Sequence, residues 1–193
     1  MGLSQSSSTG IEVPKLKAGD IIMTRAKKNW FTDFFLKFIQ YGGGGDLARF
    51  THVSCMVAPN MLIEAQAKVV KRDMLQVKKY MAKKAYRIVR KDDLSDEDAA
   101  GIAERLNSKL GEKFSLVTIF WQFWDNLFRT NWFTATLNRS NSIVCSSLIA
   151  MAWQDQIGLK FNKRDWFSVE PDDVDDETQK EGWTVISEKV EGV

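Results

Sequence analysis

The segment 51–67 contains two short apolar stretches joined by a tight turn, and this pattern constrains the fold more than any other in the chain. Thr51–Val57 and Met61–Ala67 have the composition of β-strands, and Ala58-Pro59-Asn60 between them is rich in turn-forming residues. We therefore expect a β-hairpin in which side chains alternate between the two faces of a sheet.

This hairpin contains the only histidine of the chain, His52, and a glutamate, Glu64, twelve positions later. Alternation puts His52 and Ser54 on one face and Cys55 on the other, which makes Cys55 a poor thiol partner for His52. With a three-residue loop, Ser54 faces Glu64, and His52 lies diagonal to Glu64 within reach of its carboxylate. A two-residue loop would reverse this facing, so the predicted contact depends on the turn.

The second cysteine, Cys145, opens a run of apolar residues at helical spacing that extends to Trp153. The backbone N–H groups at a helix N-terminus favour a thiolate and can stabilise an oxyanion. An isolated cysteine is more often a small buried side chain, but the presence of His52 and Glu64 favours a nucleophile. Thiolate, imidazole and carboxylate form a complete set for nucleophilic acyl chemistry, so we expect Cys145, His52 and Glu64 to be catalytic residues.

The remaining pattern predicts a mixture of strands and helices. A helix is expected to begin after Ser95, whose hydroxyl can cap it with Asp98 three positions on, and to be closed by Gly111. The segment 170–181 is acidic and is expected to be a solvated loop. The other expected elements are strands at 21–23, 86–89 and 183–186 and helices at 30–39 and 74–81.

An aromatic-rich stretch covers residues 114–137. Its interruption by Gln122, Asp125, Asn126, Arg129 and Asn131 argues against a transmembrane helix. We expect an aromatic helical insert that packs on the core or forms a lid, with an acyl-binding groove or peripheral membrane contact as the alternative.

Composition predicts a single domain. A chain of 193 residues with 44% hydrophobic content suits one globular unit, which we place at 15–193 after a flexible tail at 1–14. The net charge of +2 gives no reason to expect a nucleic-acid partner. The N-terminus lacks the features of a secretory signal, and free thiols are expected at both cysteines, so a cytoplasmic protein is the default, or one delivered by another route if phage-encoded.

Six short motifs occur in an order that resembles the circularly permuted NlpC-type, YiiX-like papain-fold proteins. The resemblance spans about residues 19–186. The motifs are Gly19-Asp20-Ile21-Ile22, Thr51-His52-Val53, Leu62-Ile63-Glu64-Ala65, Leu110-Gly111-Glu112-Lys113-Phe114, Val144-Cys145-Ser146-Ser147-Leu148-Ile149 and Glu170-Pro171-Asp172-Asp173.

The resemblance implies an α+β fold with a central antiparallel sheet packed against helices. In this family the strand that carries the histidine precedes, along the chain, the helix that carries the cysteine. It assigns Cys145 as nucleophile, His52 as its acid/base partner and Glu64 as the residue that orients the imidazole. It also implies a cysteine peptidase or amidase that acts on peptidoglycan peptides.

Two alternatives remain open. One is a lipid amidase or acyltransferase, which the aromatic insert favours, and the other is a catalytically inactive module that binds through the same groove. The mechanism needs no cofactor, and a chain with one histidine is not expected to build a histidine- or cysteine-rich zinc site.

Overall fold

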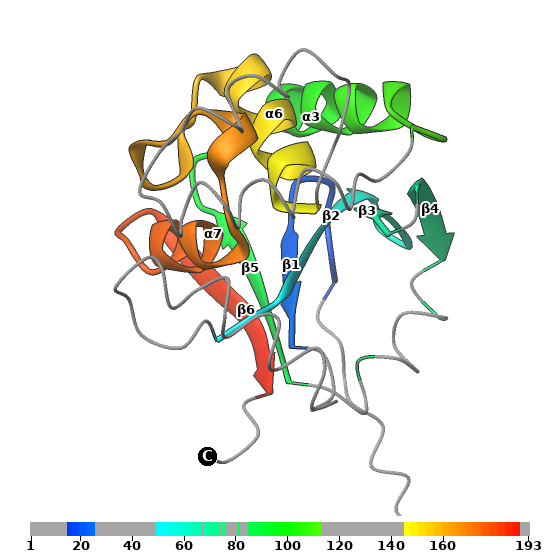
Figure 1. The fold of residues 1–193 in the computed structure, drawn as a ribbon. Coiled ribbons are helices and arrows are strands. Elements are labelled where there is room, and N and C mark those ends of the chain that lie inside the picture. The colour runs from blue at the N-terminus through cyan, green and yellow to red at the C-terminus, as the bar shows by residue number, and fades with distance from the viewer. Residues whose placement is uncertain are drawn as a thin grey trace, which may run out of the picture.

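The computed structural model describes residues 15–25, 49–66, 68–73, 75, 81, 85–112 and 145–189. They form an α+β fold in which one antiparallel sheet is packed against helices (Figure 1). The fold class predicted from the sequence is therefore confirmed. The predicted tail at 1–14, the helix at 30–39, most of the helix at 74–81 and the aromatic insert at 114–137 lie outside the described residues.

The sheet has six strands in the order β4-β3-β2-β1-β5-β6, and every neighbouring pair is antiparallel. The predicted strands are all present, whereas β4 was not predicted. The strands are β1 (Ile21–Thr24), β2 (His52–Ala58), β3 (Met61–Ala65), β4 (Val69–Asp73), β5 (Tyr86–Lys91) and β6 (Trp183–Lys189).

The hairpin of β2 and β3 combines the two turns considered from the sequence. Its strands are joined by only two residues, Pro59 and Asn60, but a bulge between Met56 and Ala58 shifts the register by one. The bulge restores the pairing of Ser54 with Glu64 that a three-residue loop would have given. The His52 side chain therefore lies on the same face as the Glu64 side chain.

Two longer helices cover one face of the sheet, α3 (Asp96–Ser108) and α6 (Cys145–Ile157) (Figure 1). The α3 helix begins as predicted, because the Ser95 hydroxyl accepts a hydrogen bond of 3.0 Å from the Asp98 N–H. Beneath these helices lies the larger core cluster, which includes Val53, Ile63 and Trp153. A smaller cluster on the opposite face contains Ile22, Met56, Leu62 and Ile88.

The acidic segment near the C-terminus differs from its prediction. It contains the helix α7 (Pro171–Thr178), preceded by the short 3-10 helices η1 (Phe161–Lys163) and η2 (Trp166–Ser168). Glu170 and Asp173 form a capping box, and Pro171 stands in the first turn. Asp173 and Asp175 are buried, so this segment is not a solvated loop.

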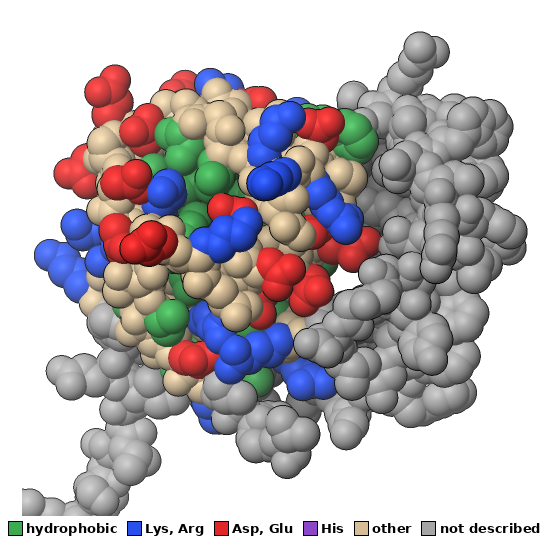
Figure 2. All heavy atoms as spheres, turned by 90° about the vertical axis from the view of Figure 1, so that its left-hand side faces the viewer, with side chains coloured by type: hydrophobic (Ala, Val, Ile, Leu, Met, Phe, Trp, Pro, Cys, Tyr) green, Lys and Arg blue, Asp and Glu red, His purple; other side chains and the backbone are tan. Residues whose placement is uncertain are grey.

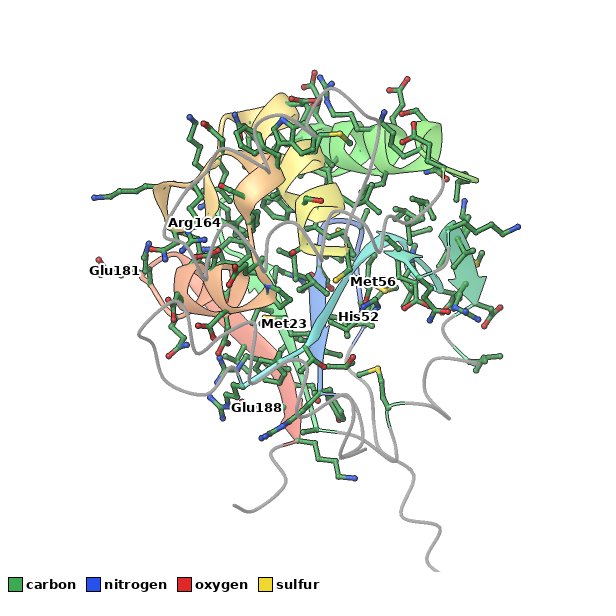
Figure 3. All side chains as sticks on the ribbon, viewed as in Figure 1. Met23, His52, Met56, Arg164, Glu181 and Glu188 are labelled. Carbon is green, nitrogen blue, oxygen red and sulfur yellow. The ribbon has the colours of Figure 1, made fainter. Side chains whose placement is uncertain are left out.

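The buried carboxylate of Asp175 belongs to an ion-pair cluster between α7 and the sheet. Arg87 of β5 lies 2.5 Å from Asp175 through Nη1 and 2.9 Å from Glu188 of β6 through Nε. The Arg87 guanidinium also lies 5.4 Å from the centre of the Phe50 ring. Figure 3 labels Glu188 near the end of β6.

The surface carries charges of both signs. Figure 2 shows acidic and basic side chains interspersed over the face turned to the viewer.

Candidate active site

The hairpin brings His52 and Glu64 into direct contact. The Nε2 atom of His52 lies 2.7 Å from the Oε2 atom of Glu64. The His52 side chain is 21% exposed and that of Glu64 9% exposed, so the pair is largely shielded from water while the imidazole keeps access to solvent. Figure 3 shows His52 and Met56 along β2, where alternation places both on the Glu64 face of the sheet.

The helix α6 brings Cys145 to the same imidazole. Cys145 is the first residue of α6, and this helix packs on β2 (Figure 1). The side chains of Cys145 and His52 interact, and each shifts the pKa of the other. Because Glu64 occupies Nε2 of the imidazole, Nδ1 is the ring nitrogen left for an interaction with the thiol. The three residues selected from the sequence thus meet in one place, although Cys145 lies 81 positions (145 − 64) after Glu64 in the sequence.

The position of α6 follows from its sequence. The helix is apolar around most of its circumference between Leu148 and Trp153, and these residues are buried between the sheet, α3 and the segment before α7. Its first turn is tied down by Ser146, whose hydroxyl donates a hydrogen bond of 2.6 Å to the Val169 carbonyl. The Trp153 ring packs 5.4 Å from that of Trp183 on β6.

The electrostatics of the site favour a thiolate and an imidazolium. Burial raises the pKa of Cys145, but the hydrogen bond and charge of His52, together with the backbone N–H groups of Val53 and Ser146, bring it below its ordinary value. Burial lowers the pKa of His52, yet its hydrogen bonds to Cys145 and Glu64 raise it to about 10. Between the two pKa values the thiol is ionised and the imidazole is protonated.

On the β3 side of β2, Val53 has no registered partner. The registered pairing of β2 with β3 begins at Ser54 and Glu64, one residue beyond Val53. Val53 and Ser146 therefore supply one N–H from a strand end and one from a helix N-terminus to the same sulfur atom.

Two residues beside Glu64 were not predicted from the sequence. Arg72 of β4 donates from Nε to Oε1 of Glu64, and Gln66 donates from Nε2 to the same oxygen at 2.9 Å. Nη2 of Arg72 also donates to Oε1 of Gln66 at 2.7 Å. The pair Val69-Val70 is typical of a strand and could have indicated a third strand after the hairpin, but the three residues that follow it are charged.

The other cysteine is separate from this site. Cys55 is fully buried on the opposite face of β2, and burial raises the pKa of its thiol to about 12. The sequence prediction that Cys55 does not face His52 is therefore confirmed by the alternation of β2. Both cysteines are free thiols.

Among the described residues, no group of three or more His, Cys, Asp or Glu side chains is arranged to hold a metal ion, and we assign no metal ligands. In the same part of the chain no helix combines the length and apolar character needed to span a membrane.

Comparison with known proteins shows a likeness in fold. The sequence matches no protein-family model and no curated protein. The fold is similar to that of YiiX from Escherichia coli O157:H7, described as a metalloprotein, with a TM-score of 0.59 and 17% sequence identity. The likeness covers 91% of this chain and 98% of the other. It shows a YiiX-like fold, consistent with the papain-like architecture expected from the motif order.

Proposed function

We propose that this protein is a cysteine hydrolase of the peptidase or amidase type, with Cys145 as nucleophile, His52 as acid and base, and Glu64 as the orienting carboxylate. The observation that carries the proposal is the continuous series of side-chain interactions from Glu64 through His52 to Cys145, with a thiol pKa below its ordinary value. A buried structural cysteine has its pKa raised, as Cys55 does.

The arrangement suits a two-step acyl transfer. In the first step the Cys145 thiolate attacks the substrate carbonyl, and His52 donates its proton to the leaving group, which departs with the bonding electrons. The N–H groups in the first turn of α6 lie beside the sulfur and can stabilise the oxyanion of the tetrahedral intermediate. In the second step His52 removes a proton from water, which attacks the thioester and releases the acid and the free thiolate.

Peptidoglycan peptides are the proposed substrate class, by resemblance to the NlpC-type enzymes. A lipid acyl or amide bond is the second candidate, because the sequence places an aromatic-rich insert at 114–137. Incubation with purified peptidoglycan and, separately, with phospholipid vesicles distinguishes the two. New free amines from peptidoglycan support the first candidate, and released fatty acid supports the second.

A thiol-labelling experiment tests the proposed cysteine pair without a known substrate. We expect iodoacetamide to alkylate Cys145 rapidly well below pH 8.5, the pKa of an ordinary thiol, and we expect His52→Ala to lower the rate at pH 7 by about tenfold. The physical reason is that the variant loses the imidazolium that holds the sulfur ionised. Mass spectrometry locates the label, and buried Cys55 serves as an internal reference.

Slow labelling of Cys145 in a folded wild-type protein, with no effect of His52→Ala, would favour the binding module over the hydrolase.

A further inference from the structure

The carboxylate of Glu64 has more partners than a histidine-orienting residue needs. One oxygen, Oε2, contacts His52, while the other, Oε1, accepts from both Arg72 and Gln66. Arg72 and Gln66 are also bonded to each other. Both oxygens are therefore held, which fixes the rotation of the carboxylate plane as well as its position.

The strand register explains how Arg72 reaches this carboxylate. In β4, Val70 lies opposite Glu64 and Arg72 lies opposite Leu62, so Arg72 is a diagonal neighbour of Glu64 on the same face. A diagonal pair of this kind is within reach of a long side chain. Gln66 is the first residue after β3, and it bonds to both Glu64 and Arg72.

We propose that Arg72 and Gln66 form a positioning clamp, which holds Glu64 in the orientation that hydrogen-bonds to His52 and thereby keeps the Cys145–His52 pair ready for reaction. This inference rests on the proposed function, because it assigns these two residues a role in the same reaction. Neither residue is a catalytic residue, since both act through Glu64.

The charges on the two sides of Glu64 agree with this role. Burial raises the pKa of Glu64, but the hydrogen bonds and charges of His52 and then of Arg72 lower it below its ordinary value. His52 on β2 and Arg72 on β4 are the charged groups that act on Glu64 within the described part of the chain. Removal of the Arg72 charge makes protonation of Glu64 easier. A protonated Glu64 no longer stabilises the imidazolium of His52, which in turn stabilises the thiolate, so the thiolate is disfavoured at low pH.

The test is the pH dependence of iodoacetamide alkylation at Cys145. In the wild type the rate falls on the acid side as the thiolate is protonated. We expect Arg72→Gln to move this acid limb upward by about one pH unit, while Arg72→Lys, which keeps the charge but lacks the planar fork, restores most of the wild-type profile.

The matched control is Lys71→Gln, which removes the same charge from the neighbouring position. Lys71 is exposed on the opposite face of β4 and bonds to Asn107, so the acid limb of this variant should coincide with that of the wild type. Gln66→Ala provides a second probe, because Gln66 is exposed and its loss leaves the ion pair of Arg72 with Glu64 in place. Its acid limb should move upward by a smaller amount.

The outcomes separate the clamp from the hydrolase proposal. If His52→Ala slows alkylation but Arg72→Gln and Gln66→Ala keep the wild-type acid limb, the proposed role of Arg72 and Gln66 is wrong. The proposed pairing of Cys145 with His52 is then still supported. A lower melting temperature in these variants with an unchanged acid limb would mean that the cluster only ties β4 to β3. If His52→Ala has no effect, the proposed function itself fails.

Discussion

A Cys145→Ala variant is expected to lose turnover completely while keeping its fold. Without the sulfur no acyl-enzyme forms, and the remaining imidazole and carboxylate have no nucleophile to activate, so we expect kcat/KM to fall by about 10⁴-fold or more. The change is small at this site, because the Cys145 side chain is only partly buried and alanine is a good helix residue. The release of free amines from peptidoglycan measures activity, and the melting temperature verifies the fold.

The matched control for this prediction is Cys55→Ala, which removes the other thiol. Cys55 is buried in the core cluster beneath α6, and its side chain points away from His52, so this variant should lose some stability but keep its activity. Glu64→Gln should lower activity less than Cys145→Ala does, because the amide still occupies the site beside His52. Activity retained in Cys145→Ala would overturn the assignment of the nucleophile.

The second large effect is expected from Arg87→Met, which breaks the buried ion-pair cluster. Arg87 is 6% exposed and Asp175 is 3% exposed, so the variant leaves a carboxylate buried without its nearest cation. We expect the free energy of unfolding to fall by about 3 kcal/mol at pH 7, a large part of the stability of an ordinary domain. Urea denaturation measures this change.

The pH dependence of the stability of Arg87→Met tests whether the unpaired charge of Asp175 causes the loss. Burial raises the pKa of Asp175 even though the Arg87 charge opposes this, and the loss of Arg87 should raise the pKa further. A carboxyl group whose folded pKa lies above its unfolded pKa destabilises the fold at higher pH, and this penalty shrinks as the pH falls toward the folded pKa. The stability deficit of Arg87→Met should therefore be smaller at pH 5 than at pH 7.

Two further variants complete this test. Arg87→Met combined with Asp175→Leu should recover much of the loss, because no buried charge then remains unpaired in that pair. Lys160→Met removes one partner of the exposed Lys160–Asp165 pair and should change stability by less than about 1 kcal/mol. An equal loss in Arg87→Met and Lys160→Met would contradict the argument.

The sequence predicted those parts of the fold that short-range patterns encode. The strands of the hairpin, the cap at Ser95 and the helix that begins at Cys145 each depend on residues close together in the chain, and all three are present. The contact of His52 with Glu64 was predicted only conditionally, because the bulge near Val57 leaves no mark in residue types. Its role is to compensate for a two-residue turn.

The parts that were missed depend on tertiary contacts. The strand β4 is short and carries charged residues at three of its five positions, and it is a strand because it pairs with β3. The acidic segment has local helix-start signals at Glu170 and Pro171, but the burial of Asp175 and Asp173 depends on Arg87 and Arg164, which pair with them from other elements. Neither partner could be identified from local sequence, and for the same reason Arg72 and Gln66 were not recognised beside Glu64.

The separation of the site residues along the chain has a consequence for folding. His52 and Glu64 lie on one hairpin, which forms through local contacts, whereas Cys145 comes from a helix 93 residues (145 − 52) beyond His52. Contacts of such long range form late, after the entropy of closing the intervening loop has been overcome. A nascent or partly folded chain thus carries an ordinary, weakly nucleophilic thiol. On the proposed mechanism, the reactive thiolate arises only when α6 docks on β2, which couples chemical competence to completion of the fold.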